Sequence, residues 1–320
     1  FKISALLAER KIPYVAIFGN HDDEGTMSRE AQMAILETLP YSLSSAGPSE
    51  IDGIGNYYIE VLGRGNTDHS ALTIYLFDTH SYSPDERKYP GYDWVKQSQI
   101  DWFRRTANSL KGKHAEYTHR HMDIAFIHIP LTEYADPELP RVGHWLEGVP
   151  APVYNPGFRD ALVQEGVLMV SAGQYVSSTA TLVYQVPANM SPATTVTIIA
   201  PFYHPDRLGA PQPTPEEARR FFPRHVDVHG GGVGFGGYAG YGGYIRRLRL
   251  FEVDANEARI RPWKRVEHGN TGQRIDEQII VDEGRPVPPP EPNVAAPHHP
   301  HDDAWVRGRE HMLFRIIWSS

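Results

Sequence analysis

Four short runs of apolar residues constrain the fold of this chain more than any other feature of its sequence. They span residues 14–18, 72–77, 124–127 and 167–170. A strand that is covered on both faces has such a continuous pattern, whereas a strand with one wet face alternates apolar and polar residues. Segments with a helical pattern lie beside the runs, at residues 1–11, 28–40 and 93–110. The chain is therefore predicted to have an α/β fold.

Polar residues or glycine follow each apolar run. Asn20 and His21 come after the first run, Asp78 after the second, His128 after the third and Gly173 after the fourth. Ligands bind outside the carboxyl ends of the strands in open α/β sheets. We therefore expect the four polar side chains to converge on one site. For Asp78 two interpretations stay open: an outer group that supports the site, or a cap of the loop that follows it.

The residue types at these strand ends favour metal chemistry. An asparagine carbonyl and an imidazole are metal ligands of borderline hardness, and the carboxylate of Asp22 beside His21 can orient the imidazole ring. No G-x-S-x-G motif of a serine hydrolase is present. The chain also lacks cysteine, which excludes disulfides and zinc-thiolate sites. A metal-assisted hydrolase is the favoured interpretation.

Composition excludes two classes of partner. The net charge is −8 and there is no long basic run, so we expect no nucleic-acid partner. No apolar run approaches the ~18 residues of a membrane helix, so we expect no membrane partner. The absence of cysteine is compatible with a reducing compartment, and a cytoplasmic location is the expectation.

Four segments together carry a family resemblance. "GNHDDE" begins at Gly19, "FIHIPLTEY" spans 126–134, and two longer segments span 76–103 and 230–265. The first two resemble motifs of the calcineurin-like metallophosphoesterases. The longer two are similar to the small purple-acid-phosphatase-like branch of that superfamily, which is common in fungi. The resemblance covers about 1–173 and 230–283.

The resemblance implies a four-layer αββα sandwich that holds two metal ions, of iron, manganese or zinc. In such sites a metal-bound hydroxide attacks phosphorus. By position, Asn20 and His128 match metal ligands of the family. His21 matches the histidine that contacts the phosphate or the leaving oxygen, and Asp22 matches the acid that orients it. The implied reaction is hydrolysis of a phosphorylated substrate, either a phosphomonoester or a phosphoprotein.

The chain departs from the family pattern at two places. The family motifs D-x-H and G-D-x-x, which supply metal-binding aspartates, have no counterpart before Gly19. The family motif G-H-x-H is expected after the fourth strand, but Gln174 and Tyr175 follow Gly173. We therefore expect a fold that lacks its first strand or strands, an incomplete metal site, and weak or absent activity. The alternative is a phosphatase-like protein that binds a partner without catalysis.

The stretch 174–229 matches nothing in the family and contains eight prolines in 56 residues. It is either translated intron or another gene-model error, or a real insertion. In the second case the cluster His225–His229 is its one candidate source of ligands. The predicted organisation is thus a phosphoesterase domain over 1–283, interrupted by 174–229. A proline- and histidine-rich tail over 284–320 is predicted to be disordered.

Two further motifs have structural interpretations. The glycines of 232–237 fit G-x-G-x-x-G, but a strand pattern at 244–253 follows instead of a helix, so a dinucleotide site is rejected. Residues 244–253 and 258–265 are predicted to form a hairpin. His114, His119 and His121 lie among basic residues, and we predict a solvated loop there.

Overall fold

The computed structural model describes residues 2–63, 69–115, 121–135, 149–173, 182–183, 228–229, 247–266, 274 and 277–287. A mixed sheet forms the centre of this part of the chain, in the order β1-β2-β3-β4-β5, with β6 paired to β4. β2, β3 and β4 run parallel, and β1 is antiparallel to β2. The strands are β1 (Tyr57–Leu62), β2 (Ser70–Leu76), β3 (Met122–Ile127), β4 (Met169–Ala172), β5 (Leu182–Val183) and β6 (Val228–His229).

A second, antiparallel sheet has the order β10-β9-β8-β7. Its main element is the hairpin that the sequence predicted, and the register of this hairpin runs from Arg247 opposite Val266 to Asp254 opposite Arg259. The strands are β7 (Arg247–Asp254), β8 (Arg259–Val266), β9 (Val281–Asp282) and β10 (Arg285–Pro286).

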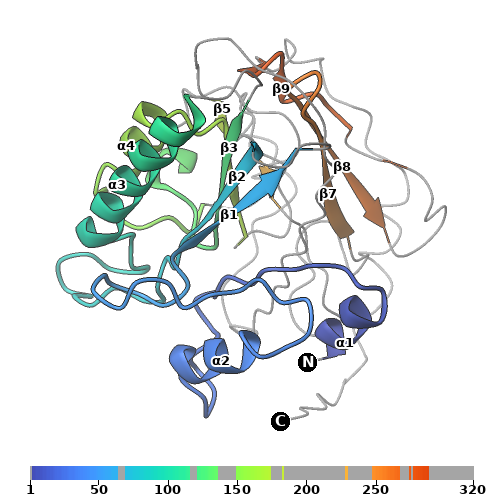
Figure 1. Ribbon diagram of the computed structural model, residues 1–320. Coiled ribbons are helices and arrows are strands. Elements are labelled where there is room, and N and C mark those ends of the chain that lie inside the picture. The colour runs from blue at the N-terminus through green and yellow to red at the C-terminus, as the bar shows by residue number, and fades with distance from the viewer. Residues whose placement is uncertain are drawn as a thin grey trace, which may run out of the picture.

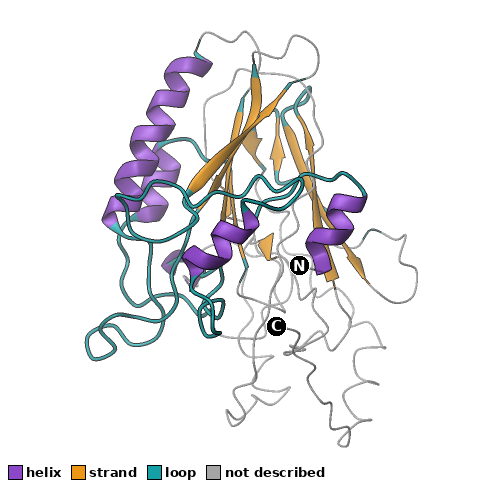
Figure 2. Ribbon diagram, turned by 60° about the horizontal axis from the view of Figure 1, so that its bottom comes forward, coloured by secondary structure: helices purple, strands orange, loops and turns teal. Residues whose placement is uncertain are grey.

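Helices and sheets are stacked in layers. α3 (Gln97–His114) and α4 (Phe158–Gln164) cover one face of the six-stranded sheet, and β7 and β8 face its other side (Figures 1 and 2). The predicted α/β class is confirmed, while a further helical layer outside the second sheet stays a prediction. The remaining helices are α1 (Lys2–Glu9), α2 (Arg29–Leu36) and the 3-10 turn η1 (Thr132–Ala135).

The central strands are buried on both faces, which explains their unbroken apolar sequences. In β2, Tyr75 packs on the helical side, and Ile74 and Leu76 pack toward the second sheet. In β3, Ala125 and Phe126 divide between the two cores in the same way. Successive side chains of a strand point to opposite faces, so each face receives every second apolar residue.

The first predicted strand, residues 14–18, is wrong. Only Tyr14 makes a β-bridge, with Ser42, and residues 15–18 belong to no helix or strand. The amide of Ala16 instead donates to Ser44 Oγ at 3.0 Å and to the Tyr57 hydroxyl at 3.2 Å. Side chains thus satisfy a backbone group that a neighbouring strand would otherwise bond. The sequence also did not predict β1 and α4.

The predicted solvated loop at His114 and His121 is wrong as well, and His119 lies outside the described residues. The side chains of His114 and His121 are only 8% and 5% exposed, and their ring centroids lie 3.7 Å apart. His114 Nε2 lies 3.2 Å from a carboxylate oxygen of Glu60, and His121 Nε2 lies 3.1 Å from one of Asp123. Carboxylates on β1 and β3 therefore hold the two rings at one end of the sheet.

Most residues of the predicted insertion lie outside the described residues, except β5 and β6. The predicted disordered tail begins too early, since Arg285 and Pro286 form β10 beside β9. The tail beyond Val287 lies outside the described residues. Among the helices that the structure describes, none has the length and apolarity needed to cross a membrane.

We expect the stacked histidines to give stability a pH dependence. Burial, then the neighbouring His121, lowers the pKa of His114 below its usual 6.5. Burial opposes protonation of His121 too, but the hydrogen bond and charge of Asp123 raise its pKa. His114 is therefore protonated more readily in the unfolded state than in the native state. As the pH falls below about 6.5, this difference lowers the free energy of unfolding. His114→Phe should therefore lose less stability than the parent between about pH 7 and pH 5.

Urea unfolding at both pH values measures this effect, and His121→Phe is the matched variant with the opposite sign. His121 adds stability that is fully present below its unfolded pKa and is lost as the pH rises through its raised native pKa. The variant His121→Phe should therefore lose more stability than the parent between about pH 7 and pH 5. Equal pH dependence in the parent and both variants would contradict the assignment.

Candidate functional site

Asn20 and His128 meet at the carboxyl edge of the sheet. Asn20 lies in the turn that follows the extended segment 14–18, and His128 comes directly after β3. Both are buried, and Asn20 Oδ1 lies 2.8 Å from His128 Nε2. Gly19 permits this approach, because a Cβ atom at position 19 would lie 2.9 Å from His128 Cε1.

Asp78, at the end of β2, reaches the same edge through Arg29. The guanidinium of Arg29 forms a buried ion pair with the Asp78 carboxylate, and its Nη2 donates to the Gly19 carbonyl at 2.8 Å and to the His80 carbonyl at 3.2 Å. Asp78 also accepts hydrogen bonds from the amides of Ile54 and His80, each at 2.9 Å. Both interpretations of Asp78 therefore hold, since the carboxylate supports the site through Arg29 and also caps the following loop at the His80 amide.

Helix α2 presents Arg29 to the site because of how the helix begins. Ser28 is its N-cap, and the Ser28 hydroxyl accepts a hydrogen bond from the Ala31 amide at 3.3 Å. Such a cap fixes the first residue of the helix in place. That residue is Arg29, whose Nη2 also donates to Ser81 Oγ at 2.7 Å and whose Nε lies 3.4 Å from an Asp23 oxygen.

His21 is held by Glu24 and Tyr82. Its Nδ1 lies 2.7 Å from Glu24 Oε1 and 3.3 Å from the Tyr82 hydroxyl, which itself donates to Glu24 Oε1 at 2.9 Å. Desolvation acts to raise the pKa of the Glu24 carboxyl. The hydrogen bonds from His21 and Tyr82 outweigh this effect and lower the pKa below its usual value. Desolvation, then the hydrogen bond to Glu24, raises the pKa of Tyr82 to about 12. The sequence analysis missed both residues, although Glu24 lies three positions after His21 in the same motif.

Asp22 lies in the same turn and bonds to its backbone. Its carboxylate accepts a hydrogen bond of 2.5 Å from the Gly19 amide. Desolvation raises the pKa of the Asp22 carboxyl, against the effect of that hydrogen bond. The orientation of His21 by Asp22 stays a prediction, while the hydrogen bond to His21 comes from Glu24.

The donors at this edge fit part of a metal centre. Asn20 Oδ1 and His128 Nε2 converge, but both are neutral. Of the nearby carboxylates, Asp22 bonds to the Gly19 amide and Asp78 to Arg29. No group of three or more His, Cys, Asp or Glu side chains within the described ranges could hold a metal ion. The described residues therefore do not complete the dinuclear site that the resemblance implies, and we derive no step through a metal.

The end of β4 adjoins this pair of donors. The amide of Gly173 donates to the His128 carbonyl at 3.0 Å, so the point where G-H-x-H was expected lies beside His128. β6 pairs in parallel with β4, which places the backbone of His229 opposite Ala172 at the same edge. His225 and the two residues after it lie outside the described residues.

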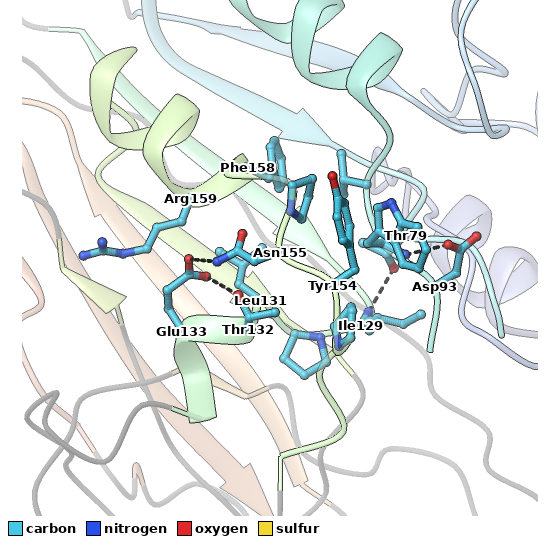
Figure 3. A pocket seen from close by; sticks show the side chains of 15 residues that line it. Thr79, Asp93, Ile129, Leu131, Thr132, Glu133, Tyr154, Asn155, Phe158 and Arg159 are labelled. Carbon is cyan, nitrogen blue, oxygen red and sulfur yellow. Dashed lines mark hydrogen bonds between the residues drawn. The ribbon is translucent and has the colours of Figure 1, made fainter. Parts of the chain in front are cut away.

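A cleft opens on the helical side of the strand ends. Thr79 and Ile129, which follow Asp78 and His128, line it, and the Thr79 hydroxyl accepts a hydrogen bond of 2.9 Å from the Ile129 amide (Figure 3). The cleft is small, with a volume of about 20 Å³. Tyr154 and Phe158 line its apolar part.

Comparisons with known proteins point to phosphatases. The chain is 33% identical over 298 residues to "Phosphatase DCR2" of Saccharomyces cerevisiae, which covers 89% of the chain and 44% of that protein. It is 37% identical over 169 residues to "Probable inactive purple acid phosphatase 29" of Arabidopsis thaliana, covering 49% of the chain and 43% of the relative. The plant protein "Probable inactive purple acid phosphatase 14" is 36% identical over 172 residues, with the same coverage.

The similarity is to phosphatase-like proteins. The relatives' names suggest the purple-acid-phosphatase-like metallophosphoesterases, whose members include proteins named as inactive. The chain spans less than half the length of the curated relatives it matches. No protein-family model matches it.

We expect Gly19→Ala to displace His128. The new Cβ would lie 2.9–3.2 Å from three atoms of the imidazole, so the ring must move away from Asn20. Overpacking of this kind costs roughly 1–3 kcal/mol of unfolding free energy. Urea unfolding and the ring NMR signals of His128 measure both effects. Gly25→Ala is the matched control, because no atom lies within 4 Å of its Cβ position. Equal stability of the two variants would contradict the close-approach argument.

We expect Arg29→Met to destabilise the protein by about 3–5 kcal/mol, because the Asp78 carboxylate would stay buried without its cation. The turn that carries Asn20 should loosen as well, since Arg29 also bonds the Gly19 carbonyl. Urea unfolding measures the loss, and Arg105→Met on the exposed face of α3 is the control. A loss below about 1 kcal/mol would show that the ion pair does not hold the site.

Proposed function

We propose that this chain is a purple-acid-phosphatase-like metallophosphoesterase, and that the edge formed by Asn20, His21 and His128 binds the phosphoryl group of a phosphorylated substrate. The observation that carries the proposal is the contact of Asn20 with His128 at a strand edge beside His21, in a chain similar to named phosphatases. A phosphomonoester, including one on a protein, is the proposed substrate.

His21 is the proposed acid or charge-stabilising group. Its Nδ1 is engaged by Glu24, so the other ring nitrogen is the one that can act on a leaving oxygen. A carboxylate on one nitrogen fixes the orientation of the imidazole ring. In the family a pair of metal ions supplies the attacking hydroxide and offsets negative charge. The described residues do not supply a complete set of ligands for two metal ions. We therefore expect little activity from this chain by itself.

A non-catalytic, phosphatase-like binding protein is the second candidate. Three relatives carry names with the words "probable inactive". The carboxylates of Asp22 and Asp78 are also engaged within the protein, by the Gly19 amide and by Arg29. Such a protein would bind phosphate at the proposed edge without hydrolysing the ester bond.

Hydrolysis of an aryl phosphate with added manganese tests the proposal. We expect rates near background for the present chain and for one with G-H-x-H restored after Gly173. A longer chain that also carries both upstream aspartate motifs should turn over. In that longer chain Asn20→Ala and His128→Ala should lower the metal content measured by mass spectrometry. His21→Ala should keep the metal and lower the rate by ~10²-fold or more.

Two outcomes would contradict parts of this proposal. If the longer chain binds metal and phosphate but does not hydrolyse the ester, the non-catalytic candidate is correct. If the present chain is robustly active and loses that activity in His225→Ala, residues of the insertion belong to the site and the donor set is complete.

A further inference from the structure

The loop that follows β2 brings an exposed tyrosine to the proposed phosphate-binding edge. Tyr82 is 38% exposed, and its hydroxyl lies 3.3 Å from His21 Nδ1. The two rings meet edge to face, with their centroids 6.1 Å apart. An accessible aromatic ring therefore adjoins the side chain that is proposed to contact the phosphoryl group.

Contacts within the loop hold the Tyr82 ring in one orientation. Tyr82 and Tyr92 form an antiparallel β-bridge, and the Ser83 amide donates to the Gly91 carbonyl at 2.9 Å. The ring of Tyr92 stacks on that of Tyr82, with centroids 5.9 Å apart and planes inclined by 20°. Tyr92 thus supports one face of the Tyr82 ring.

Contacts with the residue-20 turn hold the same loop against the site. The Ser81 hydroxyl donates to Asp23 Oδ1 at 2.8 Å and accepts a hydrogen bond of 2.7 Å from Arg29. The Tyr82 hydroxyl donates to Glu24 Oε1 at 2.9 Å. Two consecutive side chains of the loop are therefore bonded to the turn and to the first residue of α2. A ring that is fixed before the ligand binds lowers the entropic cost of binding.

A fixed and exposed ring beside a phosphate site suits an aromatic group of the ligand. Aromatic rings that stack or meet edge to face gain more than the burial of their area alone provides. In an aryl phosphate one ester oxygen joins the ring to phosphorus, so a phosphoryl group at His21 would bring that ring beside Tyr82. In phosphoserine a methylene group follows the ester oxygen and no ring is present. The arrangement therefore favours an aryl ester over an alkyl ester.

We propose that Tyr82 binds the aromatic ring of an aryl phosphate ester, and that the site consequently prefers phosphotyrosine to phosphoserine. This inference rests on the proposed function, because it requires the phosphoryl group to lie at His21. The ring of Tyr82 determines which ester is preferred, while its hydroxyl supports Glu24.

A second exposed tyrosine provides a matched control. Tyr154 is 39% exposed, and its ring packs against those of Trp94 and Tyr89, with centroids 4.8 Å and 5.1 Å away. It lines the cleft on the helical side of the strand ends. The variant Tyr154→Ala therefore removes a comparable ring from a different aromatic cluster.

Calorimetric titration of the chain with matched phosphotyrosine and phosphoserine peptides tests the inference. We expect the parent to bind the phosphotyrosine peptide about threefold to tenfold more tightly. Tyr82→Ala should bring the ratio of the two Kd values close to one. Tyr82→Phe keeps the ring and removes the hydroxyl, so it should retain the ratio, as should Tyr154→Ala. The ratio is the readout because a general disturbance of the phosphate-binding edge would change both Kd values alike.

The outcomes separate this inference from the proposed function. Equal Kd values in the parent, a preference that persists in Tyr82→Ala, or one that is lost in Tyr154→Ala would overturn the inference and leave the proposed function standing. If neither phosphopeptide binds, or if the unphosphorylated tyrosine peptide binds as tightly, the proposed function fails and the inference fails with it.

A measurement on the unmodified protein decides the matter if Tyr82→Ala does not fold. Phenyl phosphate is then the probe, and nuclear Overhauser contacts between its ring protons and those of Tyr82 are expected. Absence of these contacts from a saturated complex would overturn the inference.

Discussion

The buried ion pair between Arg29 and Asp78 is the interaction on which the candidate site depends. It joins the first residue of α2 to the end of β2, and the same guanidinium bonds the Gly19 carbonyl. One side chain thus ties a helix, a strand end and the turn that carries Asn20 and His21. A buried pair is a sensitive support, because the loss of either partner leaves a charge without compensation.

The two sheets carry different polar side chains. The first sheet presents the Asn20–His128 contact and the His21 ring held by Glu24, and the second presents a basic pair of Arg249 and Lys264. Both sheets are apolar below this level, where Phe126 meets Phe251. The inner faces of the two sheets therefore share one apolar core.

The central strands were predictable because burial on both faces requires a continuous run of apolar residues. Unbroken apolar runs predicted β2 and β3, and an alternating pattern predicted the β7–β8 hairpin. Asp78 and His128 follow β2 and β3, which are parallel neighbours, so they lie at the same edge of the sheet as predicted. Residues 14–18 have the same apolar pattern but form no ladder, because the hydroxyls of Ser44 and Tyr57 bond their backbone instead. Apolar sequence records burial and does not record which group satisfies the backbone.

The sequence alone determined the α/β class and the strands β2, β3 and β4, and it proposed Asn20, His21 and His128 as candidate site residues, since these depend on short-range patterns and on motif chemistry. Tertiary structure decided the partners: Arg29 for Asp78, Glu24 and Tyr82 for His21, and Lys264 across from Arg249. The sequence predicted a solvated loop at His114 and His121, whereas the structure stacks the two rings between the carboxylates of Glu60 and Asp123. Apart from the contact of His21 with Glu24, which spans three residues, each of these depends on which distant strands and helices come together. Hydrogen bonds and charge pairs across such distances leave no periodic pattern in the sequence.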